Sequence, residues 1–226
     1  MAAFYSTCRY LQGVTLKLFS NYQVDGRENI PPMGPLIVVS NHLSYIDPSV
    51  LSHAVNRRLN FLAKRSIFVG FPISQMLYAY GAHPLNRQGA DIAAVRWARE
   101  KLSRDGTLVI FPEGTRSHGE MIRGKQGVAR IIQMTGSPIL PIGITGTENL
   151  QSLLRAVNPT GDIKVNIGAP FSLPTIEGKI SADVMQSMTD MIMTRIASLL
   201  PNEYRGAYKT PDSNMQPPSG KQKCVE

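Results

Sequence analysis

The 226-residue sequence has few cysteines, a single tryptophan and no long apolar run. Its two cysteines, Cys8 and Cys224, lie near opposite ends and lack the close spacing of metal ligands, so we expect neither a disulfide framework nor a zinc site. No stretch approaches the ~18 consecutive apolar residues of a membrane-spanning helix. We therefore expect a chain that faces a reducing compartment and does not cross a bilayer.

Short motifs of several common enzyme classes are also absent. The sequence contains no Gly-x-Ser-x-Gly, no His-Glu-x-x-His, no Gly-x4-Gly-Lys-Ser/Thr and no Gly-x-Gly-x-x-Gly. These motifs are typical of α/β-hydrolase nucleophiles, zinc proteases, nucleotide phosphate loops and dinucleotide sites. We expect no metal and no nucleotide redox cofactor.

Positive charge is in excess, with 24 Lys and Arg against 16 Asp and Glu and a net charge of +8. This balance favours anionic partners, namely phosphates, lipid headgroups, nucleic acid or an acidic carrier protein. Nucleic acid is disfavoured because aromatic residues are not interleaved with basic clusters.

The first 24 residues have the periodicity of an amphipathic helix. Its apolar residues at helical spacing are Phe4, Cys8, Leu11, Val14, Leu16, Leu18, Phe19 and Tyr22. Arg9 and Lys17 supply positive charge. Such a helix either lies on a membrane surface or packs on its own core, because amphipathicity does not specify what the apolar face contacts. We assign residues 1–24 to a membrane-contact helix and keep the packed alternative open.

Short apolar runs alternate with amphipathic segments along the rest of the chain. Expected strands are 36–39, 60–63, 82–86, 107–111, 139–144 and 163–167, and expected helices are 47–56, 71–80, 90–104, 127–135 and 182–200. This alternation predicts a single α/β sandwich over residues 25–204, with a mostly parallel or mixed sheet flanked by helices. Residues 205–226 are rich in Pro, Ser and Lys without periodicity, so we expect a disordered tail.

The segment 41–47 places His42 and Asp47 five positions apart across a loop that leads into a helix. In such a loop Asp47 can reach back to one ring nitrogen of His42 and leave the other free to accept a proton. A base without a nucleophile suits direct attack by a substrate hydroxyl on an activated acyl group. The alternative is structural, because Ser44-x-x-Asp47-Pro48 also matches a helix start.

The segment 111–117, Phe-Pro-Glu-Gly-Thr-Arg-Ser, follows an apolar strand. Gly114 allows positive φ and close approach to a ligand, and Arg116 can bind phosphate with two parallel donors. These features predict an anion site. The alternative is a surface turn held by an ion pair between Glu113 and Arg116.

Four segments in sequence order resemble the four blocks of the glycerolipid acyltransferase family, of the 1-acyl-sn-glycerol-3-phosphate acyltransferase type. They are Asn41-His42-x4-Asp47, Gly81…Arg87, 111–117 and Ile139-Leu-Pro-Ile142, within a match from about Val24 to Pro174. The second block departs from the family pattern, because Pro84-Leu85-Asn86 stands where members tend to have an aromatic residue and an isoleucine.

The resemblance implies a role for particular residues. His42 would be the general base and Asp47 its partner. The acceptor's glycerol phosphate would be held by Lys64, Arg87, Glu113, Gly114, Thr115 and Arg116, and Pro141 would lie near the acyl donor. The resemblance implies no cofactor and no metal.

The activity implied is transfer of a fatty acyl group from acyl-CoA or acyl carrier protein to lysophosphatidic acid, which forms phosphatidic acid. The protein would act as a peripheral or monotopic protein at the cytoplasmic face of the cell membrane, on an anionic surface. Two alternatives stay open. The acceptor could be glycerol 3-phosphate, another lysophospholipid or a lyso-aminolipid, or the chain could be a non-catalytic basic module that binds lipid surfaces.

Overall fold

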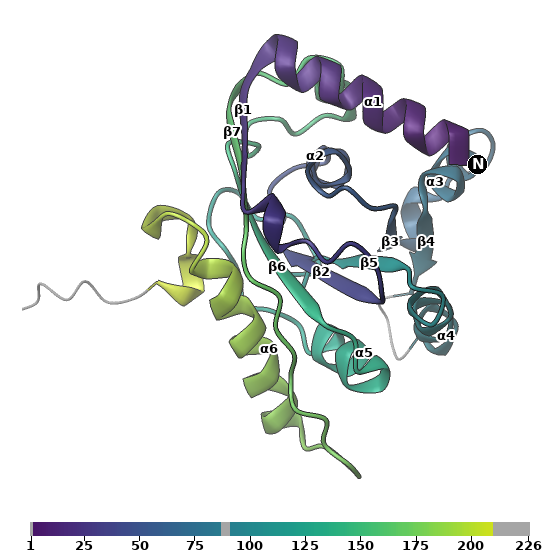
Figure 1. Cartoon of the computed structure of the whole chain (residues 1–226), viewed down its shortest axis with the longest axis vertical. Coiled ribbons are helices and arrows are strands. Elements are labelled where there is room, and N and C mark those ends of the chain that lie inside the picture. The colour runs from purple at the N-terminus through teal and green to yellow at the C-terminus, as the bar shows by residue number, and fades with distance from the viewer. Residues whose placement is uncertain (1, 87–90, 210–226) are drawn as a thin grey trace, which may run out of the picture.

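The computed structural model describes residues 2–86 and 91–209, in which a seven-stranded sheet lies between two layers of helices (Figure 1). The strand order is β1-β7-β6-β2-β5-β3-β4. The strands are β1 (Ser20–Asp25), β2 (Leu36–Ser40), β3 (Leu59–Lys64), β4 (Ala82–Leu85), β5 (Thr107–Ile110), β6 (Ile139–Thr145) and β7 (Gly161–Ile167). All neighbours are parallel except β6 and β7, so the expected α/β sandwich with a mixed sheet is confirmed.

Helices cover both faces of the sheet. One layer holds α1 (Ala2–Phe19), α2 (Asp47–Ala54) and α3 (Ile73–Tyr80), and the other holds α4 (Ile92–Leu102), α5 (Gly127–Thr135) and α6 (Ala182–Ala197). Short 3-10 turns are η1 (Arg27–Asn29), η2 (Arg65–Ile67), η3 (Leu153–Ala156), η4 (Asn202–Tyr204) and η5 (Gly206–Tyr208).

The central strand β2 is buried on both faces. Leu36 and Val38 pack in the cluster beneath α1 and α2, whereas Ile37 and Val39 pack in the cluster beneath α4, α5 and α6. This explains why an uninterrupted apolar run predicts the strand. Because β2, β3, β5 and β6 run parallel, they all end at one edge of the sheet, here called the carboxyl edge. The segments that follow β2 and β5 carry the two motifs, so the fold brings them together.

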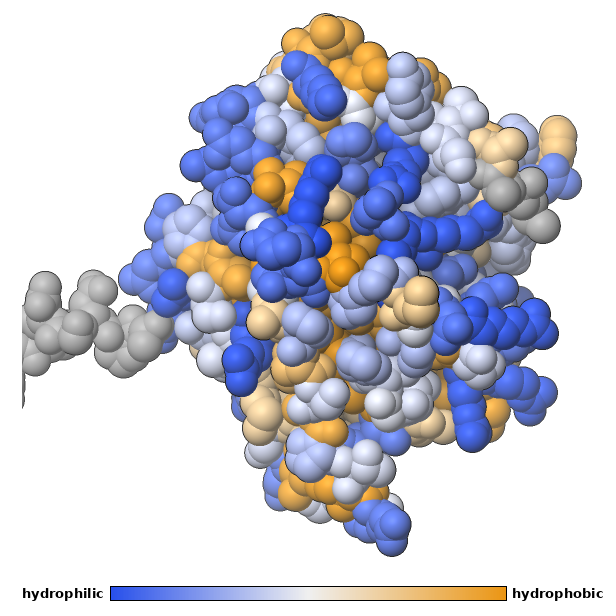
Figure 2. Space-filling model, in the orientation of Figure 1, coloured by the Kyte–Doolittle hydropathy of each residue, from blue (hydrophilic) through white to orange (hydrophobic). Residues whose placement is uncertain are grey.

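Helix α1 has one buried face and one exposed apolar face. Tyr5 and Leu16 are buried, so that face packs on the body of the protein. Phe4, Leu11 and Leu18 lie on the outside and are 37%, 54% and 69% exposed. Figure 2 shows hydrophobic side chains over α1 at the top of the molecule. None of the described helices combines the length and apolar character needed to span a membrane.

The N-terminal helical segment is shorter than expected. It ends at Phe19, and β1 continues to Asp25 and pairs with β7. Half-buried Tyr22 and Val24 alternate with exposed neighbours, and this period of two belongs to a strand and not to a helix. The boundary expected between residues 24 and 25 therefore cuts through a strand of the sheet.

The expected C-terminal tail begins inside structured chain. The backbone N–H of Ala207 donates to the carbonyl oxygen of Met121 at 3.0 Å, and the Tyr208 hydroxyl donates to Asp190 at 2.9 Å. These bonds attach η5 to the body of the protein, so the domain continues to Lys209 instead of ending before Arg205. Residues 210–226 lie outside the described residues.

Candidate active site

His42 and Asp47 are in direct contact at the carboxyl edge, where β2 ends and α2 begins. The Nδ1 atom of His42 lies 2.8 Å from Oδ2 of Asp47. Because a carboxylate only accepts hydrogen bonds, Nδ1 is the donor, and in the neutral ring Nε2 is left unprotonated. The His42 side chain is 16% exposed and that of Asp47 is fully buried. This arrangement provides an oriented proton acceptor.

Asp47 also accepts hydrogen bonds from three other groups. Its Oδ2 atom accepts from the backbone N–H of Leu43 and of Ser44, both at 2.7 Å. Its Oδ1 atom accepts from the hydroxyl of Thr147 at 2.7 Å, which comes from the loop after β6. A buried carboxylate is stable only when its oxygens are bound in this way. The contacts therefore hold Asp47, and through it the ring of His42, in one orientation.

The structural alternative for this segment, a helix start, also holds. The helix α2 begins at Asp47-Pro48, and the carboxylate of Asp47 accepts from the backbone N–H of Ser44 at 2.7 Å, although no side chain caps the helix at Ile46. The carboxylate of Asp47 points back along the loop, and the buried hydroxyl of Ser44 donates to the carbonyl oxygen of Leu150. Ser44 is therefore tied into the loop and is poorly placed to act as a nucleophile.

Asn41 connects the end of β2 to β6. Its side-chain amide donates to the carbonyl oxygen of Ile144 and accepts from the N–H of the same residue, each at 2.8 Å. Asn41 is completely buried. This paired contact fixes the point at which the His42 loop leaves the sheet.

The second motif binds the backbone of His42 on both sides. The N–H of His42 donates to Oε1 of Glu113 at 2.9 Å, and the N–H of Ser117 donates to the carbonyl oxygen of His42 at 2.8 Å. The imidazole also stacks on the ring of Phe111, with 4.1 Å between centroids. The two sequence motifs thus form one structural unit.

Glu113 supports this unit from the interior of the protein. It is completely buried, and its second oxygen accepts from the N–H of Ile122 at 3.0 Å. Burial raises the pKa of Glu113 to about 7, although the N–H groups of Ile122 and His42 act in the opposite direction. The acceptor-binding role expected for Glu113 does not fit this place, because a phosphate could reach neither oxygen. Its position is that of a support for the loop.

Arg116 stacks on the aromatic ring of Tyr45. Its guanidinium carbon lies 3.5 Å from the ring centroid, which is close range for a cation–π contact. The alternative of an ion pair between Glu113 and Arg116 does not hold, since backbone N–H groups occupy the carboxylate of Glu113. Tyr45 belongs to the His42 loop, so this contact places a positive charge beside that loop.

Lys125 crosses the turn at Gly114. Gly114 has φ of +70°, and a Cβ atom there would lie 2.9 Å from Cδ and 3.2 Å from Nζ of Lys125. The turn therefore favours glycine for its backbone conformation, and the side chain of Lys125 packs directly against it. Thr115 is exposed at the tip of the same turn. The ammonium of Lys125 thus lies beside the turn that carries Arg116.

The remaining predicted site residues are more dispersed. Lys64 is exposed at the end of β3, and β5 separates this strand from β2. Pro141 is buried in β6 opposite Val39 of β2. Arg87 lies outside the described residues.

Sequence reasoning missed Tyr45, Thr147 and Lys125. Tyr45 lies within the first motif, and Lys125 follows Gly124 shortly after the second, so proximity to the motifs was the available signal. Thr147 follows the fourth block, but its partner Asp47 is 100 positions away in sequence.

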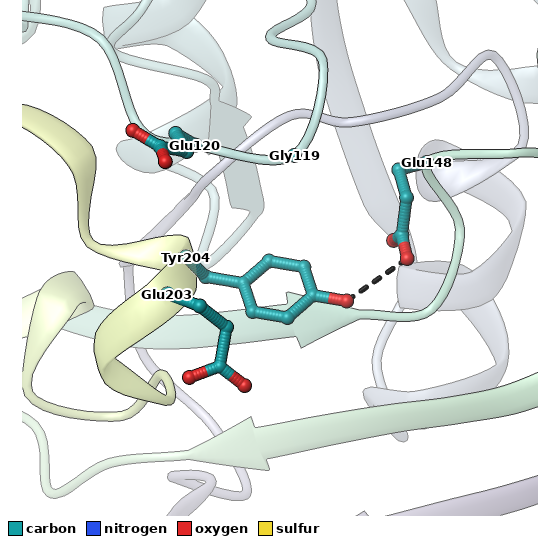
Figure 3. Close-up of a pocket in the computed structure, with 5 residues that line it drawn as sticks. All are labelled: Gly119, Glu120, Glu148, Glu203 and Tyr204. Carbon is teal, nitrogen blue, oxygen red and sulfur yellow. Dashed lines mark hydrogen bonds between the residues drawn. The ribbon is translucent and has the colours of Figure 1, made fainter.

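An acidic hollow of about 200 Å³ lies near the C-terminal segment (Figure 3). It is lined by Gly119, Glu120, Glu148, Glu203 and Tyr204. The Tyr204 hydroxyl donates to Glu148 at 2.9 Å and so attaches the C-terminal segment to the loop after β6. Its carboxylates would repel a phosphate, and within the described ranges no three side chains are grouped so that they could hold a metal ion. The hollow is therefore a poor site for the substrate's phosphate.

The raised pKa of Glu113 predicts a pH-dependent stability. Because its pKa rises from an ordinary value of 4.5 to about 7, the folded protein binds this proton more tightly than the unfolded chain does. The free energy of unfolding should therefore fall by an amount on the order of a few kcal/mol as pH rises through this window. Glu113→Gln should remove this contribution, since its own cost to the hydrogen bonds does not depend on pH. Urea denaturation at several pH values measures the free energy of unfolding of both proteins. The value for wild type minus the value for Glu113→Gln should fall as pH rises. A value that stays constant or rises with pH would contradict the assignment.

Comparison with known proteins identifies the family. A family model described as Acyltransferase matches residues 21–145, more than half of the chain. The chain is 26% identical over 197 residues to the 1-acyl-sn-glycerol-3-phosphate acyltransferase of Streptococcus pneumoniae, covering 84% of this chain and 72% of that protein. It is 29% identical over 163 residues to the chloroplastic 1-acyl-sn-glycerol-3-phosphate acyltransferase of Brassica napus, covering 70% of this chain and 47% of that protein.

A solved structure gives the same result. The crystal structure of the 1-acyl-sn-glycerophosphate (LPA) acyltransferase from Thermotoga maritima matches with a TM-score of 0.66 and 28% sequence identity, covering 83% of this chain and 76% of that one. The chain spans about half the length of the plant relative. With the family model matching over both motifs, the chain belongs to the acyltransferase family.

Proposed function

We propose that this chain transfers a fatty acyl group from an acyl thioester, acyl-CoA or acyl carrier protein, to the free hydroxyl of lysophosphatidic acid and forms phosphatidic acid. The observation that carries the proposal is the contact of His42 with buried Asp47, next to a loop that presents Arg116. The relatives named above, which are called acyltransferases of this acceptor, support the same assignment.

The proposed reaction passes directly from donor to acceptor. Nε2 of His42 accepts the proton of the acceptor hydroxyl while the oxygen attacks the thioester carbonyl carbon. The tetrahedral intermediate then breaks its carbon–sulfur bond, and the departing thiolate takes the proton from His42. General-base help of this kind contributes roughly 10²–10⁴ in rate. Because the Ser44 hydroxyl is bound to Leu150, no acylated serine is part of the proposal.

The acceptor's phosphate is assigned to the cations at the carboxyl edge. Arg116 offers two parallel donors, and Lys125 lies across the same turn. Lys64 and Arg87 belong to the same proposal, as the sequence resemblance implies. Tyr45 acts as a positioning residue, because its ring holds the guanidinium of Arg116.

The substrates also suggest where the protein works. Lysophosphatidic acid carries an acyl chain and resides in a bilayer, and the exposed row of Phe4, Leu11 and Leu18 on α1 is apolar enough to contact one. Arg9 and Lys17 on the same helix add attraction to anionic lipid of about 1 kcal/mol each. We therefore propose a peripheral or monotopic protein at the cytoplasmic face of the cell membrane.

The decisive variant is His42→Ala. Thiol release from palmitoyl-CoA in detergent should require lysophosphatidic acid and should fall by at least about 10²-fold in the variant, because the base is lost. His118→Ala, which removes an exposed histidine, is the matched control and should keep full activity.

Each other outcome points to a different function. Release without any acceptor would indicate a thioesterase, and release with glycerol 3-phosphate or another lysolipid alone would indicate a different acceptor. If wild type releases no thiol with any donor and acceptor, the chain is a binding module and the proposal fails.

Tyr45 tests the phosphate assignment. Removing its ring with Tyr45→Ala should raise the KM for lysophosphatidic acid by roughly 2- to 30-fold, the equivalent of a cation–π contact of about 0.5–2 kcal/mol. Tyr45→Phe keeps the ring and should behave like wild type. Steady-state kinetics with each substrate varied in turn gives both values. This role would be ruled out if the KM for lysophosphatidic acid rose equally in the two variants. It would also be ruled out if Tyr45→Ala raised the KM for the acyl donor as much as the KM for lysophosphatidic acid.

A further inference from the structure

Exposed apolar side chains gather on two segments that leave the carboxyl edge. One segment, residues 67–78, runs from the end of η2 into α3, and its Val69 and Phe71 are 66% and 80% exposed. The other is η3 with the residue that follows it, where Leu154 and Val157 are 78% and 66% exposed. No residue of α3 is buried, although most of its side chains are apolar. Such exposure is unusual for a surface without a partner.

Both segments leave the same edge of the sheet as the active site. The first follows β3 and the second follows β6, and both strands run parallel to β2, so their ends share the edge that carries His42. The side chain of Gln151, just before η3, donates to the carbonyl oxygen of Leu43 at 2.9 Å. The η3 side therefore contacts the His42 loop, and segment 67–78 leaves the same edge of the sheet beyond β5.

Helix α1 connects the two segments. Near its start, the ring of Tyr5 packs against Tyr80, the last residue of α3 and two positions beyond the first segment, with 5.4 Å between centroids. Further along, Gln12 and Thr15 both donate to the carbonyl oxygen of Ala156 in η3. The exposed row of α1 and the two segments thus belong to neighbouring parts of the same helical layer (Figure 1).

Negative charge is missing from this part of the sequence. No Asp or Glu occurs in residues 1–24 or between Asp47 and Asp91, and Asp47 itself is fully buried. Lys64 and Arg65 are exposed at the beginning of the first segment. Glu120, Glu148 and Glu203 line the hollow of Figure 3, next to the C-terminal segment. Lys64 and Arg65 beside the first segment and Arg155 within η3 give these apolar side chains a positively charged border, although Glu148 precedes η3 and Asp162 follows it. Apolar side chains with a positively charged border complement an anionic lipid surface.

We propose that the segment 67–78 and the η3 turn form a membrane-docking surface at the mouth of the active site and insert Val69, Phe71, Leu154 and Val157 between the headgroups of an anionic bilayer. This docking proposal deepens the proposed function and rests on it, because docking serves to bring the lipid acceptor to His42. Docking by these segments turns His42 towards the bilayer, so the acceptor's hydroxyl reaches the base while its acyl chain stays in lipid. Contact through α1 alone would not fix that orientation.

The test uses two double variants of the full chain, Val69→Ser with Phe71→Ser and Leu154→Ser with Val157→Ser. Each should weaken co-sedimentation with phosphatidylcholine–phosphatidylglycerol vesicles by about tenfold or more, because membrane affinity scales with the apolar area inserted. Met33→Ser is the matched control. Met33 is 78% exposed but precedes β2, at the opposite edge of the sheet, and this variant should bind like wild type.

Further measurements separate docking from catalysis. Circular dichroism should show that the variants are folded, and in detergent they should keep wild-type acyl transfer while losing it on vesicles. Unchanged vesicle binding in both double variants, an equal loss in Met33→Ser, or a change of oligomeric state in place of vesicle binding would overturn the docking proposal. A different result would overturn the proposed function and leave the docking surface in place. In that result, wild type binds vesicles through these residues but transfers no acyl group in detergent.

Discussion

The buried carboxylate of Asp47 is the constraint on which the site depends. It lies in the interior and is surrounded by four hydrogen-bond donors, namely the ring of His42, two backbone N–H groups of its own loop and the hydroxyl of Thr147. Removing any one donor would leave a buried oxygen less well bound, which costs more than an ordinary hydrogen bond contributes. The loop after β2, the start of α2 and the loop after β6 therefore meet at this carboxylate, and the ring of His42 is oriented by its hydrogen bond to it.

The sheet makes this meeting possible. Because β2 pairs with β5 on one side and β6 on the other, all in parallel, the three loops that follow them leave the same edge. The motif after β5 then binds both backbone groups of His42 and directs Arg116 onto Tyr45. His42 and Arg116, the proposed base and the proposed phosphate-binding cation, are thus positioned by the same contacts. A displacement of either loop would disturb both functions, which gives a physical reason for the two motifs to occur together.

Local patterns predicted the elements well, and distant contacts account for the errors. The apolar run of β2 and the periodicity of α5 define those elements in sequence, and the contact of His42 with Asp47 spans only five positions. The strand β1 was missed because it follows a helix without a turn residue and is paired only with β7, far along the chain. Burial decided the place of Glu113, and pairing over 100 positions decided that of Thr147. Neither quantity can be read from a motif.

The central claim is that Asp47 holds His42 in the tautomer that leaves Nε2 free to accept a proton. Nitrogen-15 NMR of the His42 ring measures this directly, because protonated and unprotonated ring nitrogens differ strongly in chemical shift. In the neutral ring, the account predicts a proton on Nδ1, hydrogen-bonded to Asp47, and an unprotonated Nε2. A neutral ring with its proton on Nε2 would contradict it, since that nitrogen could not then act as the base.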